Sequence, residues 1–152
     1  MSEVAIYKEI PKWFESQVSV AIGWIKCGDE FLFLQRSSKS RDPFVWAVPG
    51  GKVEQDETPL QGMVREMQEE TSLNLQAELI KDLGAFYVKT PEWRYTYHMF
   101  FIEFQKKPQV VITPEHHDFK WMTLSDCQKM PLMVGQQETI QEFNLRIAHE
   151  GC

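Results

Sequence analysis

The chain has 152 residues, of which 43% are hydrophobic, 12% aromatic and 25% charged, and this composition predicts one ordinary globular domain over residues 1–152. Its formal net charge of −6 argues against a nucleic-acid-binding protein, whose affinity would rest on clustered Lys and Arg. The sequence contains neither an apolar run near the roughly 18 residues of a membrane span nor a secretory signal, so we expect no membrane partner and a cytoplasmic location.

The first half of the chain predicts a β-hairpin. Apolar residues alternate from Gln17 to Ile25, which is typical of a strand with one buried face. A turn, "GDE", separates this strand from a second apolar run at Phe31–Arg36. Strand character resumes at "FVWAV", and we expect Pro49 and the paired glycines after it to end that strand.

A helix is predicted to begin at Thr58. Thr58 is a good N-cap, Pro59 suits the first helical position, and Gln61 completes a capping box. The apolar residues that follow lie at helical spacing and form one stripe, made of Leu60, Met63, Val64 and Met67. We expect the helix to end just before Ser72, with Asn74 as an alternative end.

The second half predicts two more long strands, a short strand and a closing helix. The long strands are expected at residues 75–88 and 94–104, on either side of the turn "KTPEW". "PEHHD" is expected to be a loop that leads into a short strand at Phe119–Met122. Apolar spacing in residues 135–151 predicts a helix that ends at Gly151. These elements indicate a mixed sheet packed between helices.

Three cysteines, Cys27, Cys127 and Cys152, are far apart in the sequence and lack CxxC spacing. This pattern indicates neither a disulfide framework nor a zinc site, because both need paired or closely spaced cysteines. We therefore expect reduced thiols without a catalytic role.

Three glutamates crowd the predicted helix. Glu66, Glu69 and Glu70 fall within an arc of about 100° at the border of the apolar stripe. Gly62 lies on the same side, where a helical glycine costs roughly 0.5–1 kcal/mol relative to alanine, which suggests that other atoms approach closely. The glutamates could form a solvated face, a docking surface for a basic partner, or a binding site for a cation.

The spacing of eight residues resembles the Nudix box: Gly51, Glu57, Arg65, Glu66, Met67, Glu69, Glu70 and Leu73. The preceding "VWAVPGGKVE" is similar to the usual lead-in of that superfamily, whose MutT-like members the chain resembles. The resemblance implies an α/β Nudix fold, an α/β/α sandwich with a central mixed sheet. One position departs from the pattern, since Ser72 stands where the family usually has glycine, and a positive φ there would cost roughly 1 kcal/mol.

The resemblance also implies a chemistry. It assigns Glu66, Glu69 and Glu70 to binding of Mg²⁺ or Mn²⁺, hard cations that prefer oxygen ligands. Arg65 and Glu57 would orient these carboxylates. The implied activity is attack by water at phosphorus in the pyrophosphate linkage of a nucleoside diphosphate derivative, such as a nucleoside triphosphate.

Residues outside the helix complete the expected site. Glu115 resembles the distant glutamate that supplies a further metal ligand or a base in Nudix enzymes. The expected substrate-binding residues, which could contact phosphate, are Arg36, Gly50, Gly51 and Lys52. The identity of the general base stays open between Glu115, a glutamate of the box, and His116 or His117.

Two alternatives follow from the same resemblance. His116 or His117 could act as base in hydrolysis of a GDP-sugar at the sugar carbon, although that branch usually has an altered box. The chain could also be a non-catalytic module that binds a nucleotide. In each case the expected ligand is a nucleotide or nucleotide sugar, and a homodimer is possible because dimers are frequent among such relatives.

Overall fold

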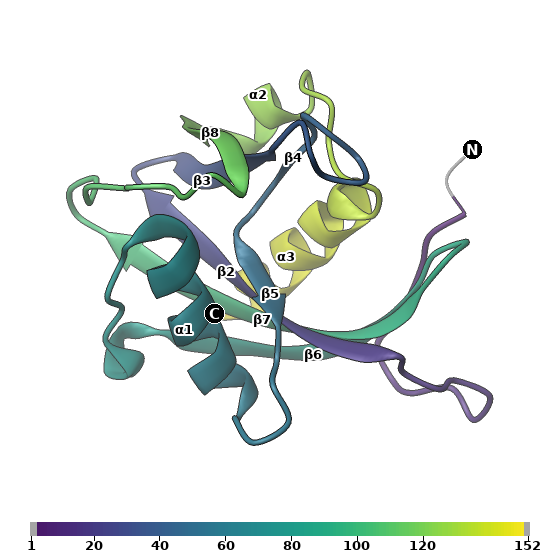
Figure 1. The fold of residues 1–152 in the computed structure, drawn as a ribbon. Coiled ribbons are helices and arrows are strands. Elements are labelled where there is room, and N and C mark those ends of the chain that lie inside the picture. Colours follow the sequence, from purple (N-terminus) through teal and green to yellow (C-terminus); the bar gives the residue numbers. More distant parts are fainter. Residues whose placement is uncertain (1–2, 151–152) are drawn as a thin grey trace.

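The computed structural model describes residues 3–150 and shows an eight-stranded sheet with helices on both faces (Figure 1). The strands are β1 (Ala5–Tyr7), β2 (Val18–Cys27), β3 (Glu30–Arg36), β4 (Trp46–Ala47), β5 (Gly50–Lys52), β6 (Lys81–Lys89), β7 (Arg94–Phe104) and β8 (His116–Met122). The helices are α1 (Pro59–Thr71), a short 3₁₀ turn (Ala77–Leu79), α2 (Leu124–Cys127) and α3 (Gln136–Glu150). The predicted α/β/α sandwich with a mixed sheet is confirmed.

Strand β2 is the centre of the sheet, where the sheet forks. The strand order is β1-β6-β7-β2-β3-β4, and the β2–β7 pair is parallel whereas the other pairs are antiparallel. Strand β7 occupies one edge of β2, and two strands share the other edge. Lys26 and Cys27 pair with β3, whereas Val20–Ile22 pair with β5. Between them the Gly23 N–H donates to the Pro49 carbonyl at 3.0 Å. The fork brings β5 beneath helix α1.

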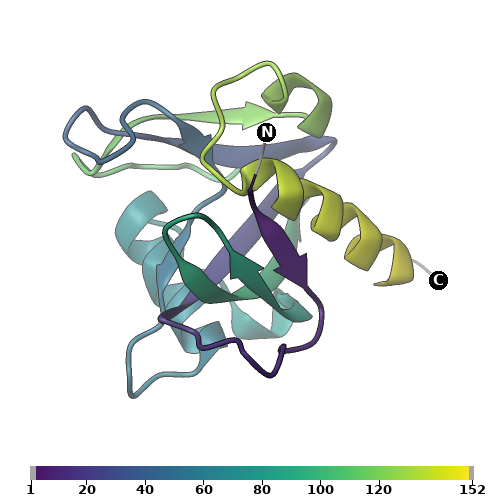
Figure 2. The same cartoon turned by 90° about the vertical axis from the view of Figure 1, so that its right-hand side faces the viewer.

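Two apolar cores lie on opposite faces of the sheet. Figures 1 and 2 show the helices on these faces, with α1 on one and α3 on the other. Trp24 of β2 packs toward α3, where its ring stacks on Phe143 with centroids 4.4 Å apart. Met63 and Met67 of α1 are fully buried against the other face. A Cβ at Gly23 would lie 3.2 Å from both sulfur-bearing side chains, so this glycine lets α1 approach the sheet closely.

Helix α1 begins as predicted. The Gln61 N–H donates to Thr58 Oγ1 at 3.1 Å, and the Thr58 N–H donates to Gln61 Oε1 at 2.8 Å. This reciprocal pair is the expected capping box, with Pro59 at the first helical position. The cap places the helix start directly after the segment that carries Glu57.

Helix α1 ends at Thr71 with Ser72 in the left-handed conformation, at φ 65° and ψ 15°. A side chain in this region costs roughly 1–2 kcal/mol relative to glycine. Neighbouring hydrogen bonds offset part of that cost, because the Ser72 hydroxyl donates to the Val111 carbonyl and the Val111 N–H donates to Thr71 O, both at 3.0 Å. The positive φ considered for Ser72 is thus confirmed, and the helix does not extend to Asn74.

Three strand boundaries were predicted wrongly. Gly50 and Gly51 do not end strand structure but belong to β5, which pairs with β2. A Cβ at Gly50 would lie 2.5 Å from the Ala21 carbonyl oxygen, so glycine is required where these backbones meet. Strand β6 begins at Lys81 rather than near residue 75, because the preceding residues form a 3₁₀ turn.

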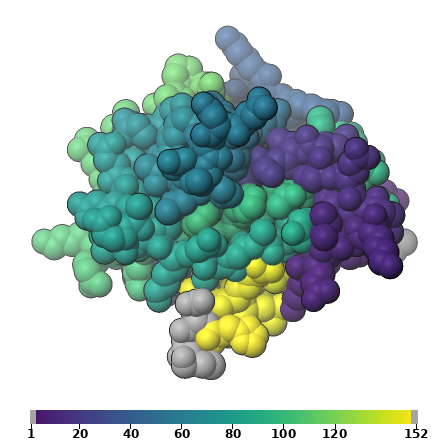
Figure 3. Space-filling model, turned by 90° about the horizontal axis from the view of Figure 1, so that it is seen from below, coloured from purple at the N-terminus to yellow at the C-terminus, as the bar shows by residue number. Residues whose placement is uncertain are grey.

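The third error concerns "PEHHD", expected to be a loop. Strand β8 begins at His116, three residues before the predicted start, because it pairs with β3 as far as Arg36 through a β-bulge. The sequence also did not predict α2 or β1. Strand β1 pairs with β6 at one edge of the sheet. In the space-filling view from below, the purple N-terminal residues lie against teal and green atoms from the middle of the chain (Figure 3).

Among the described helices, none combines the length and the apolar character needed to cross a bilayer. Cys27 and Cys127 are free thiols. The predicted helix end at Gly151 and the third cysteine, Cys152, lie outside the described residues.

Candidate active site

Arg65 is the centre of the acidic cluster. Its guanidinium donates to both Glu57 oxygens, at 3.1 and 2.7 Å, and to Glu66 Oε1 at 3.0 Å. It also reaches Glu69, at 3.2 and 3.3 Å, and the Lys52 carbonyl at 2.9 Å. Bonding to Glu57, together with Glu66 and Glu69, holds the pKa of Arg65 above its usual range. One cation therefore orients three carboxylates, which is the supporting role predicted for Arg65 and Glu57.

Glycines shape the space around these carboxylates. A Cβ at Gly51 would lie 2.4 Å from the carboxyl carbon of Glu66, and a Cβ at Gly62 would lie 2.9 Å from Glu57 Oε1. The close approach expected at Gly62 is confirmed, and the approaching atoms belong to the Glu57 side chain and to the backbone of Val53. Glycine is therefore needed at positions 51 and 62 because a carboxylate lies against each of them, not because the chain turns there.

Glu70 differs from Glu57, Glu66 and Glu69, because Arg65 forms no hydrogen bond or ion pair with it among residues 3–150. Its Oε1 accepts a hydrogen bond from the Gly50 N–H at 3.0 Å, and its Oε2 lies 3.7 Å from His116 Nε2. The side chain is 12% exposed. Burial, followed by the influence of Arg36, lowers the pKa of His116, which favours the neutral imidazole at this contact with Glu70.

Burial makes it energetically costly for the carboxyl groups of Glu66 and Glu70 to carry a negative charge. Desolvation raises the pKa of Glu66, although its bonds to Arg65 act in the opposite direction. Desolvation and the nearby Glu66 raise the pKa of Glu70 to about 8. Glu115 raises the pKa of both. Such carboxyl groups are matched to a positively charged ligand that would remove the electrostatic penalty.

The structure brings the other predicted residues to the same region from separate elements. Arg36, at the end of β3, stabilises ionised Glu70 electrostatically. Glu115 lies immediately before β8, opposite that strand end. Lys52 has an exposed side chain, and its carbonyl is the atom that contacts Arg65. Gly50 supplies the backbone donor to Glu70.

Two features of this region escaped the sequence analysis. The first is the contact of His116 with Glu70, which joins β8 to α1 and depends on strand register. The second is Phe44, a non-glycine residue with φ 63° whose exposed ring meets His117 edge-on, with centroids 5.2 Å apart. Only the Asp-Pro dipeptide before Phe44 indicated a turn there.

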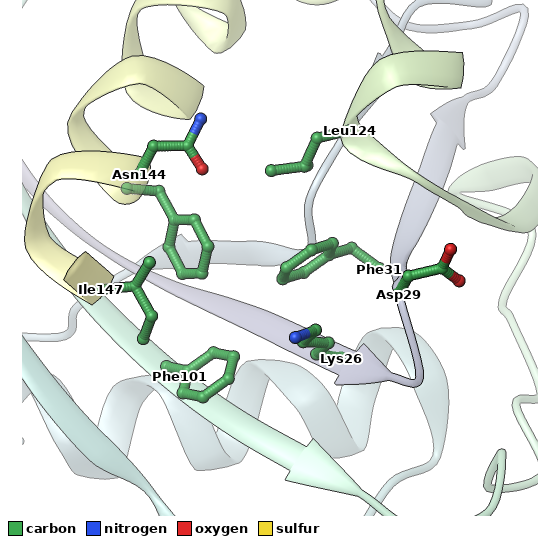
Figure 4. A pocket seen from close by; sticks show the side chains of 8 residues that line it. Lys26, Asp29, Phe31, Phe101, Leu124, Asn144 and Ile147 are labelled. Carbon is green, nitrogen blue, oxygen red and sulfur yellow. The ribbon is translucent and has the colours of Figure 1, made fainter. Parts of the chain in front are cut away.

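A cavity of about 300 Å³ lies elsewhere, between α3 and the ends of β2 and β3. Figure 4 shows its apolar floor of Phe31, Phe101 and Ile147 and, at its rim, Lys26 and Asp29. The acidic cluster does not contribute to its lining. Aromatic rings form much of the lining of this cavity, and the charged groups of α1 lie on the other face of the sheet.

Comparison with known proteins agrees with this geometry. Residues 16–143 match the family model described as "NUDIX domain". The chain is 28% identical over 146 residues to a dihydroneopterin triphosphate diphosphatase of Haemophilus influenzae, covering 86% of this chain and 90% of that protein. It is 46% identical over 62 residues to an 8-oxo-dGTP diphosphatase of Proteus vulgaris, covering 40% and 55%.

The fold is also similar to a solved structure of a MutT protein from Methanosarcina mazei Go1. The TM-score is 0.71, with 26% identity, and the match covers 84% of this chain and 92% of that one. The family model spans most of the chain, and six of the eight residues of the box lie in or against one acidic cluster, whereas Met67 and Leu73 are buried in the apolar core. The chain therefore belongs to the Nudix hydrolase superfamily, as a MutT-like pyrophosphohydrolase.

Proposed function

We propose that this protein is a Mg²⁺- or Mn²⁺-dependent hydrolase that cleaves the pyrophosphate linkage of a nucleoside triphosphate-like substrate by attack of water at phosphorus. One observation carries the proposal: Glu57, Glu66 and Glu69 share the single guanidinium of Arg65, and a fourth carboxylate, that of Glu70, the most buried of the box glutamates, is not bonded to it. The cluster has an excess of negative charge that a divalent cation would neutralise.

The residues fit such a cation. Hard divalent ions take carboxylate oxygens, and here Glu66, Glu69, Glu70 and Glu115 would supply them. Within residues 3–150, no three acidic, imidazole or thiol groups form a ready-made ligand set, because Arg65 draws Glu66 and Glu69 toward itself. Glu69 is 56% exposed and its bonds to Arg65 are the longest of the set, so it is the ligand most free to turn.

The protein's own side chains and backbone groups would orient the metal-binding carboxylates and bind the substrate. Bound divalent ions supply charge neutralisation for the diphosphate and a lowered pKa for water. Arg65 and the Gly50 N–H hold the carboxylates in place, and we expect the side chains of Arg36 and Lys52 to neutralise phosphate oxygens. Glu115, which is exposed and close enough to Glu66 and Glu70 to raise their pKa, is our candidate for accepting the proton from the attacking water.

The relatives suggest the class of substrate. The Haemophilus and Proteus proteins are named for hydrolysis of dihydroneopterin triphosphate and 8-oxo-dGTP, two triphosphates that carry a fused bicyclic ring. We infer a triphosphate of this type here. A GDP-sugar hydrolase is less well supported, because the carboxylates that favour attack at phosphorus are all present.

The test is a substrate screen with and without EDTA. It includes nucleoside triphosphates, oxidised nucleotides, dihydroneopterin triphosphate, dinucleoside polyphosphates, ADP-ribose and nucleotide sugars. In H₂¹⁸O, label in a phosphate product establishes attack at phosphorus, whereas label on the sugar indicates the GDP-sugar alternative. Glu69→Gln and Glu70→Gln should abolish turnover with the fold intact. Metal-independent turnover, or wild-type rates in both variants, would refute the proposal.

A further inference from the structure

We propose that His116 is a positioning residue that holds Glu70, the most buried carboxylate of the box, for cation binding. This inference rests on the proposed function and extends it to a residue on β8, outside the box. Glu70 has one neighbour at each oxygen. The Gly50 N–H donates to Oε1 at 3.0 Å, and His116 Nε2 lies 3.7 Å from Oε2.

The fold aims His116 at Glu70 through a β-bulge. Gln35 pairs with Asp118, but Arg36 pairs with His116, so His117 is the extra residue. Phe119 and Trp121 of β8 pack into the core on the α1 side, and strict alternation would put His117 on that side and His116 on the other. The bulge reverses this order, and bulges commonly re-aim a side chain beside an active site.

The burial of His116 supports a role beyond packing. Its side chain is 11% exposed, and its Nδ1 atom is buried without a hydrogen-bond partner among the described residues. Buried polar atoms in native proteins are nearly always satisfied. An apolar side chain would fill this place at lower cost, so the imidazole is best explained by what its two nitrogens bind.

The two nitrogens have separate roles. A proton on Nε2 is directed at Glu70 Oε2, which leaves Nδ1 as an acceptor for a water molecule or a substrate donor group. The distance of 3.7 Å is longer than a hydrogen bond, and contacts at catalytic sites often tighten when the ligand arrives. His117 is adjacent in sequence, but its side chain is exposed and its ring contacts Phe44 rather than Glu70. It is therefore the matched control.

The experiment measures Mn²⁺ binding to the protein alone by titration calorimetry, before any turnover is measured. Loss of a group that orients a metal ligand typically weakens metal affinity about 10–100-fold. We expect His116→Ala and His116→Asn to weaken Mn²⁺ binding at least about tenfold. His116→Gln, whose amide reaches the position of Nε2, should recover most of the affinity. His117→Gln should bind like the wild type.

A double variant separates positioning from a general effect. In the Glu70→Gln background, His116→Ala should weaken Mn²⁺ binding no further, because its effect acts through Glu70. If His116→Ala unfolds, the comparison of His116→Gln with His116→Asn decides the question in folded proteins. Equal affinity in the wild type and in both His116 amide variants, or full additivity with Glu70→Gln, would overturn the inference. A wild-type protein that neither binds Mn²⁺ nor hydrolyses any triphosphate would instead refute the proposed function.

Discussion

Gly51 and Glu66 are so close that a Cβ at position 51 would lie 2.4 Å from the carboxyl carbon of Glu66. Gly51→Ala must therefore push this carboxylate away from its place beside Arg65. Displacement of an active-site group by about 1 Å can cost roughly 10²-fold in rate, and we expect a loss of that order in kcat.

Gly28→Ala is the control for this substitution. Gly28 has φ 64° and open space around its Cβ position, so alanine there costs roughly 1 kcal/mol of stability without touching the site. Steady-state kinetics and urea melts of both variants make the comparison. Full activity in Gly51→Ala would show that Glu66 can occupy another position.

Arg65→Lys should reduce activity roughly 10–100-fold. Lysine keeps the charge but cannot bond to Glu57, Glu66 and Glu69 at once, because its three donors diverge from a single atom. Arg41→Lys is the matched control, since Arg41 pairs with Glu92 at 2.6 Å but both side chains are more than half exposed. Exposed pairs contribute little, so this variant should retain wild-type kcat and KM.

Glu70→Gln should stabilise the metal-free protein while it removes activity. Burial raises the pKa of Glu70 to about 8 in the folded state, from an ordinary value of 4.5. Between these values the folded state binds the proton that the unfolded state has released, so the stability of wild type falls as pH rises from about 4.5 through 8. The Glu70→Gln side chain cannot ionise, so the stability advantage of this variant over the wild type should grow as the pH rises over the same range.

Thermal melts in EDTA at pH 5, 6.5 and 8 test this expectation. The advantage at pH 8 should be about 1–3 kcal/mol, the usual cost of an uncompensated buried polar group, which is a few degrees in Tm. Glu69→Gln is the control, because Glu69 is 56% exposed and its substitution should change stability little. A wild type that is as stable as Glu70→Gln at pH 8 without metal would contradict the argument.

Phe44→Ala should be less stable than Phe44→Gly by about 1–2 kcal/mol. Both variants lose the ring, but only alanine must keep a Cβ at φ 63°. The conformation is held by two hydrogen bonds, from the Phe44 N–H to Arg36 O at 3.0 Å and from Gln35 Nε2 to Phe44 O at 3.1 Å. Urea denaturation measures the difference, and equal midpoints would show that the loop relaxes.

Local chemistry predicted helix α1 and its acidic cluster almost completely. The cap at Thr58 and the apolar stripe depend on neighbours in sequence, so they could be read without the fold. The same holds for the Arg65–Glu69 pair, one turn apart on one helix. The spacing of the box also brought Glu57 and Gly51 into the prediction, although their contacts are tertiary.

Features that depend on strand pairing were missed. Gly50 and Gly51 look like turn residues in sequence, and only the backbone of β2 makes them a strand. His116 looks like a loop residue, and only the bulge opposite Arg36 turns it toward Glu70. Both cases involve contacts between residues far apart in the chain, which local patterns do not encode.

The loop that follows β3 is pinned at its base. The Arg36 N–H donates to the Val45 carbonyl at 2.9 Å, and the Phe44 N–H returns to Arg36 O. Residues 37–43 thus leave and rejoin the sheet at one point, so insertions or deletions there need not displace the carboxylates of α1. Evolution can therefore vary this segment in length and sequence while the carboxylates keep their arrangement, so the loop and the acidic cluster can diverge at different rates.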